Sequence, residues 1–172
     1  MIKFEKVSLE QFMKDCKSLQ VGGSLWFSSD EEIEKVYNAI QLPRRGTPGS
    51  AGYDFFLPFP VAFVSPTSTT IPTGVRVILP EEMFLMCVPR SGLGFKYGMR
   101  LKNSTGIIDS SYSEADNEGH IMAKIDTDNA FKLNAGDRFM QGIVLRYFVT
   151  YDDDPIQPKR TGGFGSTGGT GE

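Results

Sequence analysis

The sequence predicts an all-β domain with a short helical extension at its front and a glycine-rich arm at its end. Three observations favour this class. From Leu42 onward Pro and Gly recur every few residues, helical stripes disappear, and short runs rich in Val, Ile, Phe and Tyr alternate with turn residues. Many short strands without intervening helices indicate a sandwich, a jelly roll or a barrel.

Residues 1–41 are expected to form two short helices. Ser8 and Gln11 form a capping box at the start of the first. Its apolar stripe has helical spacing and consists of Leu9, Phe12, Met13, Cys16 and Leu19. After a Gly-Gly break, Ser29 and Glu32 form a second box. The stripe that follows it consists of Ile33, Val36, Tyr37 and Ile40.

Residues 42–158 are expected to form the β-domain. Its strands are apolar runs bounded by turn residues, namely Tyr53–Leu57, Val75–Leu79, Met83–Val88, Ile107–Ile108, Ile121–Ile125 and Phe139–Tyr147. Residues 159–172 differ, because six of the thirteen residues from Arg160 to Glu172 are glycine and only Phe164 is large. Such a segment cannot pack as a strand or helix alone, so we expect a flexible arm.

Composition excludes several function classes. A formal net charge of -3 provides no global basic field for a nucleic acid. The longest apolar run, Met83 to Val88, is far shorter than the ~20 residues that span a bilayer, and the first residues show no secretory signal pattern. Two isolated cysteines and the single His120 do not have zinc-ligand spacing. We therefore expect a cytoplasmic protein with free thiols that binds neither nucleic acid nor membrane.

Five segments combine polar side chains with turns. They are Pro48–Phe56, Pro89–Gly98, Leu101–Tyr112, Ala135–Gly142 and Arg160–Gly169. Each alone has an ordinary structural explanation, such as a turn carboxylate at Asp54 or a flexible terminus. Arg138 and Gln141 interrupt an apolar strand, so they need partners within the protein or on a ligand.

In this order on an all-β chain, the five segments resemble the trimeric deoxyuridine triphosphatases (dUTPases). The matching motifs are AGYD, PRSG, GIIDSSY, GDRFMQ and GFGSTG. The resemblance covers roughly residues 42–168 and leaves the helical front outside it. It implies a jelly-roll-like β-barrel, a homotrimer, and hydrolysis of dUTP to dUMP and pyrophosphate with Mg²⁺, which lowers dUTP and supplies dUMP for dTTP synthesis.

The resemblance also implies roles for individual residues. Asp109 would be the general base for the water that attacks the α-phosphorus, and Asp54 would hold Mg²⁺ through water or hold a neighbouring group. Tyr112 would pack under the deoxyribose and exclude a ribose 2′-hydroxyl. The other implied substrate-binding residues are Arg90, Ser91, Gly92, Asn103, Gly106, Ile108, Gln141, Arg160, Phe164, Gly165, Ser166 and Thr167. Phe164 would cover the uracil as the arm folds down.

The sequence departs from the family pattern after Tyr112. A Gly-Glu-Ile continuation is usual, whereas residues 113–119 form a longer, acidic insert with Glu114, Asp116 and Glu118. This insert is either a solvated turn or a docking surface. It resembles the enlarged hairpins of staphylococcal phage dUTPases, some of which bind a repressor, and a phage-encoded chain would act in the host cytoplasm.

The arm shows a second departure, because its arginine precedes Phe164 by four residues instead of five, so Lys159 is an alternative to Arg160 as terminal-phosphate ligand. Two rival functions stay open. One is a dCTP deaminase, which shares the fold, and the other is a protein that keeps the fold only to bind a partner.

Overall fold

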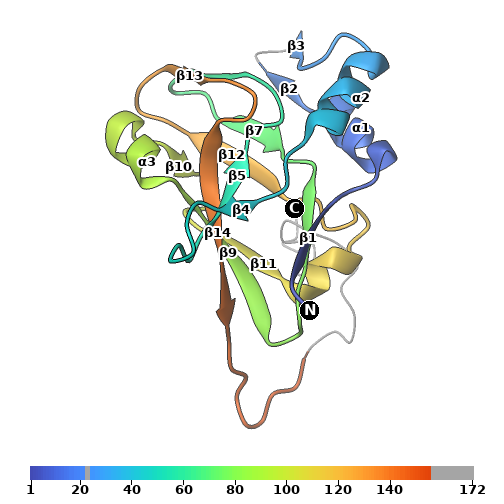
Figure 1. Ribbon diagram of the computed structural model, residues 1–172, viewed down its shortest axis with the longest axis vertical. Helices are drawn as coiled ribbons and strands as arrows, with labels where there is room; N and C mark the ends of the chain where they lie inside the picture. Colours follow the sequence, from blue (N-terminus) through green and yellow to red (C-terminus); the bar gives the residue numbers. More distant parts are fainter. Residues whose placement is uncertain (22–23, 156–172) are drawn as a thin grey trace, which may run out of the picture.

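Short antiparallel strands dominate the computed structural model, which describes residues 1–21 and 24–155 (Figure 1). The largest sheet has the strand order β11-β9-β14-β5-β4. Its strands are β4 (Arg44–Arg45), β5 (Tyr53–Phe56), β9 (Met83–Pro89), β11 (Gly106–Asp109) and β14 (Arg138–Arg146). β14 pairs along its length with β9 and, near its start, with β5. The expected strands at these three places are confirmed to within one or two residues.

The other sheets are smaller. A three-stranded sheet has the order β10-β12-β7, with β7 (Thr69–Pro72), β10 (Arg100–Leu101) and β12 (Met122–Asp126). Three strand pairs complete the set: β1 (Lys3–Lys6) with β8 (Val75–Ile78), β6 (Val61–Phe63) with β13 (Phe131–Leu133), and β2 (Gln20–Val21) with β3 (Ser24–Leu25). The all-β class is confirmed, although the ladders among the described residues do not join into one closed barrel.

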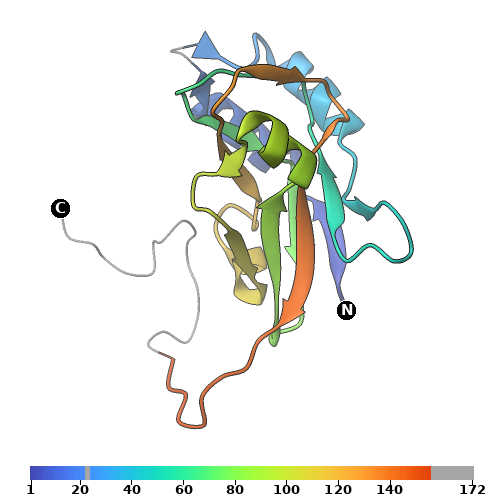
Figure 2. The same cartoon turned by 90° about the vertical axis from the view of Figure 1, so that its left-hand side faces the viewer.

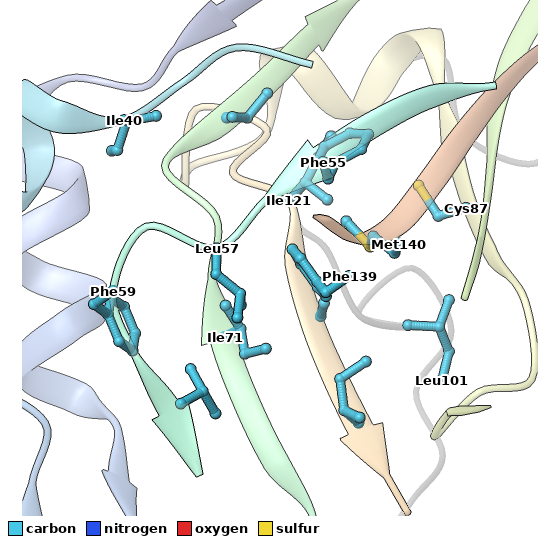
Figure 3. Packing of buried hydrophobic residues seen from close by; sticks show 14 of the residues in the cluster. Ile40, Phe55, Leu57, Phe59, Ile71, Cys87, Leu101, Ile121, Phe139 and Met140 are labelled. Atoms are coloured by element: carbon cyan, nitrogen blue, oxygen red, sulfur yellow. The ribbon is translucent and has the colours of Figure 1, made fainter. Parts of the chain in front are cut away.

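One hydrophobic core joins the sheets. Figure 3 shows side chains from several strands gathered between them, including Phe55, Leu57, Ile71, Phe139 and Met140. Alternate residues of β8 and β12 are buried, as expected for strands with one face on a core. Each fully buried large apolar side chain contributes roughly 2 kcal/mol.

Two helices, α1 (Leu9–Ser18) and α2 (Asp30–Ala39), lie side by side at one end of the molecule (Figures 1 and 2). Both predicted N-caps form, because Ser8 accepts from the Gln11 N–H and Ser29 from the Glu32 N–H. The return halves of the boxes differ: the Gln11 amide donates to Asp15, and Glu32 accepts from Ser28. The apolar stripes of both helices enter the same core as the strands, although a boundary at residue 41 stays a prediction.

The expectation of no helix between the strands is wrong. Helix α3 (Ser91–Tyr97) follows β9 directly, and a 3-10 helix, η1 (Ser110–Glu114), follows β11. Two glycines within α3 give it low intrinsic propensity, so packing supplies its stability. Tyr97 stacks on Phe131 at 4.0 Å between ring centroids, and Gly98 ends the helix in the left-handed conformation at φ 63°. No described helix is long and apolar enough to cross a membrane.

Candidate active site

A pocket of about 200 Å³ opens beside residues 100–112. This segment, predicted as a hairpin and called the hairpin below, contains β10, β11 and η1, although β10 pairs with β12 and β11 pairs with β9. Four of the predicted substrate-binding residues line it together, namely Asn103, Gly106, Ile108 and Tyr112. The rest of its lining is largely apolar and was not predicted: Cys87, Leu101, Ile107, Ile121, Met122, Ala123, Lys124 and Met140. Only the order of the strands in space brings these side chains together, so the linear sequence carried no signal for them.

The wall of the pocket is close-packed where β11 crosses β9. Gly106 pairs with Cys87, and a side chain at Gly106 would begin 3.1 Å from the Cys87 Cβ. Glycine at this position therefore allows β11 to lie close against β9. Burial raises the pKa of the Cys87 thiol to about 12, so the thiol is neutral at physiological pH and serves as an apolar wall.

Tyr112 lies in η1 and is 5% exposed. Its hydroxyl donates to the carbonyl of His120 at 2.9 Å and accepts from the side-chain amide of Asn117 at 2.8 Å. One residue of the acidic insert, Asn117, and the residue just beyond it, His120, therefore fix the phenol, and the ring forms part of the pocket wall.

Asp109 ends β11, where it pairs with Phe84 at the start of β9. The side chain is exposed, next in sequence to Ile108 of the pocket lining. An exposed carboxylate next in sequence to the pocket lining is accessible to water and to a ligand, as a general base must be.

A polar cluster lies on the other side of β14. Asp54 on β5 is largely buried and accepts ion pairs from two arginines, Arg90 and Arg138, each at 3.2 Å. Gln141 of β14 pairs with Asp54 across the ladder, and Ser91 and Gly92 begin α3 immediately after Arg90. The carboxylate therefore fixes the two guanidinium groups. The predicted role of Asp54 toward a metal-bound water stays a prediction.

The two groups are far apart within one chain. Arg90 follows the last residue of β9, whereas Asp109 pairs with Phe84, the second residue of that strand. Arg90 lies six residue steps of extended chain beyond Phe84, which corresponds to about 20 Å. Within one chain, Asp109 and the arginine cluster therefore lie at opposite ends of β9.

No cluster of three or more His, Cys, Asp or Glu residues that could hold a metal ion occurs in the part of the chain that the structure describes. Mg²⁺ keeps several waters and binds substrate phosphates, so it needs only one or two protein carboxylates. A site with Asp54 as its protein carboxylate therefore fits Mg²⁺ bound to a polyphosphate. The predicted arm residues, Lys159, Arg160, Phe164, Gly165, Ser166 and Thr167, lie outside the described residues.

The structure also ties the hairpin to the helical front, which sequence reasoning missed. His120, used there only to exclude zinc, is fully buried and bonded to Asp15 of α1. Glu118 of the insert bonds to Ser8. The single histidine of the sequence, directly after the insert, could have suggested a structural role. Its partner Asp15 is 105 residues away, so the spacing of residues did not identify it.

Comparison with known proteins identifies the relatives of this architecture. Residues 38–168 match the family model described as dUTPase. The deoxyuridine 5'-triphosphate nucleotidohydrolase of Lactococcus lactis is 39% identical over 80% of this chain and 95% of its own. That of Hahella chejuensis is 36% identical over 78% and 91%.

Solved structures agree with these matches. A dUTPase from Streptococcus mutans has a TM-score of 0.59 and 33% identity, covering 66% of this chain and 90% of its own. A mutant dUTPase from phage phi11 of S. aureus, described with a structural Mg(II) ion, has a TM-score of 0.58 and 20% identity, covering 69% and 92%. The phage protein is similar in fold alone.

Proposed function

This chain belongs to the dUTPase family, and from that premise we propose that it hydrolyses dUTP to dUMP and pyrophosphate. The observation that carries the proposal is the pocket that Asn103, Gly106, Ile108 and Tyr112 line together, on a chain that also builds an arginine cluster. The exposed Asp109 is next in sequence to Ile108 of this lining. The reaction lowers dUTP and supplies dUMP for dTTP synthesis. It takes place in the cytoplasm, where nucleotide pools lie, and in the host cytoplasm if a phage encodes the chain.

The pocket binds the nucleoside and distinguishes its base and sugar from those of other nucleotides. Asn103, Gly106 and Ile108 provide backbone and side-chain contacts around the uracil edge. Cytosine presents the reversed donor pattern and would leave buried groups unpaired, which is a large penalty, and the methyl group of thymine is excluded by the close-packed walls. Tyr112 packs under the sugar, where an added 2′-hydroxyl would collide with the fixed ring.

Asp109 acts as the general base. It orients a water molecule toward the α-phosphorus and accepts its proton, while pyrophosphate leaves with the electron pair of the broken P–O bond. Its exposure and its place directly after Ile108 of the pocket lining support this role, because a nucleoside in the pocket would extend its phosphates toward solvent.

The arginine cluster binds the phosphates. Arg90 and Gln141 face the charge that develops on the phosphate oxygens, assisted by Ser91 and Gly92, and Asp54 keeps Arg90 in place. From the arm, Phe164 covers the base while Arg160, Gly165, Ser166 and Thr167 close over the terminal phosphates.

Mg²⁺ is the implied cofactor. When bound, it neutralises phosphate charge and polarises the bond that breaks. Asp54 is the protein carboxylate that would reach it, through water, and the substrate phosphates would supply most of its other ligands.

We propose a homotrimer in which each active site is shared. The separation of about 20 Å along β9 supports this, since the pocket of one copy then needs the arginine cluster of the next. A closed threefold ring of heterologous contacts meets that need for all copies at once.

Product analysis tests the proposed reaction against the dCTP deaminase alternative. The purified chain is incubated with dUTP, dTTP, dCTP and UTP, with Mg²⁺ and with EDTA. Pyrophosphate release from dUTP alone, dependent on Mg²⁺, is the expected result. Ammonia release from dCTP would establish the deaminase, and no turnover of any nucleotide would leave only a binding protein.

A second role in binding a repressor protein has one observation in its favour. Glu114 and Asp116 of the insert are exposed beside the pocket, whereas Glu118 is held by Ser8. The double change Glu114→Gln with Asp116→Asn should spare hydrolysis and weaken repressor binding in a pull-down assay. Asp152→Asn, at an exposed carboxylate outside the insert, is the control, and equal binding by both variants would refute the second role.

A further inference from the structure

The acidic insert is anchored at its end to helix α1. Glu118 accepts from the backbone N–H of Ser8 at 2.7 Å and from its hydroxyl at 2.5 Å. Ser8 is the N-cap of α1, so a carboxylate 110 residues away satisfies the N–H that the Gln11 side chain was expected to reach. The insert and the start of the helix therefore hold each other in place.

A tight backbone turn allows this contact. Glu118 and Gly119 both adopt the left-handed conformation, at φ 59° and 73°. A side chain at Gly119 would begin 2.7 Å from the Tyr112 carbonyl, so only glycine fits. The turn directs Glu118 outward to α1, and His120, which follows Gly119, into the core.

His120 makes the second contact with α1. Its Nε2 accepts from the backbone N–H of Gly74 at 2.8 Å, so the proton of the neutral ring is on Nδ1. That N–H donates to Asp15 at 2.5 Å, and the ring is fully buried. Both ring nitrogens are used, which fixes the orientation of the ring.

The same residue holds Tyr112. The carbonyl of His120 accepts the Tyr112 hydroxyl, and the N–H of His120 donates to Asn117, whose amide donates to that hydroxyl. A continuous path of hydrogen bonds therefore leads from Asp15 through His120 to the phenol that forms part of the pocket wall.

We propose that α1 is a positioning element for sugar selection, in which Asp15 and Glu118 fix His120 and so hold Tyr112 against the nucleotide. This rests on the proposed function of the pocket. The helical front, which lies outside the family's usual pattern, then tightens the rejection of UTP instead of serving as a separate module. Asp15, Glu118 and His120 are positioning residues, since they act only through Tyr112.

The test compares kcat/KM for dUTP and for UTP in the full-length assembled protein. Asp15→Leu removes the acceptor for the His120 N–H at similar size. It should lower the ratio of kcat/KM for dUTP to kcat/KM for UTP about tenfold. This loss is part of the ~100-fold by which a pocket rejects an added hydroxyl. Asp15→Asn keeps an acceptor oxygen and should restore the ratio to within about twofold. Asp30→Asn, which breaks the exposed Lys17–Asp30 contact between α1 and α2, is the matched control and should change nothing.

Two further measurements keep the proposal testable. If Asp15→Leu does not fold, Glu118→Ala decides, because it removes only the surface contacts to Ser8 and should lower the ratio about threefold. The NMR signal of the Tyr112 ring, assigned with Tyr112→Phe, should shift in Asp15→Leu and not in Asp30→Asn.

The outcomes separate the two proposals. An unchanged dUTP to UTP ratio in the folded variants, or an equal loss of both activities with the Tyr112 signal unmoved, overturns the positioning role while the proposed reaction stands. A wild-type chain that hydrolyses no nucleotide refutes the proposed reaction instead, and the Tyr112 signal then still decides whether α1 holds the phenol.

Discussion

The pocket and the arginine cluster differ in how they are built. The pocket is apolar and close-packed, and its hairpin is anchored to the helical front by the Glu118 and His120 contacts. The cluster is a set of charges on partly exposed side chains, held by one largely buried carboxylate, Asp54. The first has a fixed shape in a single chain, whereas the second presents charge outward. Under the proposed function, selection of the nucleoside and stabilisation of phosphate charge would thus belong to different surfaces of one copy.

The largest effect is expected at Asp109, the proposed general base. Asp109→Asn removes the general base without changing size and should lower kcat by about 10³-fold. Binding of dUTP, measured by calorimetry with Mg²⁺, should change little. Asp116→Asn, an exposed carboxylate in the neighbouring insert, is the control and should keep full turnover. A small loss in Asp109→Asn would show that another group activates the water.

Mixing inactive copies tests whether the two surfaces come from different chains. Arg90→Ala and Asp109→Asn variants are each expected to be inactive, but co-refolded trimers should recover about one quarter of the wild-type rate, because one shared interface in four then holds both intact halves. Size-exclusion chromatography with light scattering confirms the assembly. No recovery from a proven mixed trimer would place both halves of the site in one chain.

A change at Asp54 tests whether this carboxylate orients the arginines or also binds a metal-bound water. Asp54→Asn weakens both arginine ion pairs, so KM for dUTP should rise by roughly tenfold as Arg90 loses its orientation. The Mg²⁺ concentration for half-maximal rate distinguishes the two roles. An unchanged value indicates that Asp54 acts through the arginines alone, whereas a raised value supports the predicted contact with a metal-bound water.

The elements that local pattern determines were predictable. Both helices begin at their predicted caps, Ser8 and Ser29, because capping depends on residues three positions apart. Helix α3 was missed because its glycines oppose helix formation and the Tyr97–Phe131 stack that supports it is a tertiary contact.

The same limit applies to the site. Motif order identified Asp54, Arg90, Asp109 and Gln141, which four separate segments supply, but not their distances. The separation of Asp109 from Arg90 follows from the register between β11 and β9, which cannot be deduced from any single residue of the sequence. The link from Glu118 to Ser8 joins residues 110 positions apart, so it too required the structure.

The smallest effect concerns acid stability of the link between α1 and the hairpin. Burial raises the pKa of Asp15, but hydrogen bonds from His120 and Gln11 outweigh it and hold the pKa below its ordinary value of 3.8. Burial likewise raises the pKa of Glu118, and the bonds from Ser8 more than offset it, below 4.5. Groups with a lowered pKa stabilise the fold above the unfolded value, and this contribution is lost as pH falls through the folded value.

The melting temperature of the wild type should therefore fall as pH is lowered from 5 to 3, and the fall should be smaller in Asp15→Asn. The expected difference is about 3 °C, or ~1 kcal/mol for a chain of this size. Lys17→Ala, which alters the same helix without removing a carboxylate, should give a curve parallel to the wild type. Parallel curves for Asp15→Asn and the wild type would show that the charge of Asp15 adds no stability at neutral pH beyond the hydrogen bond that an asparagine oxygen also accepts from His120.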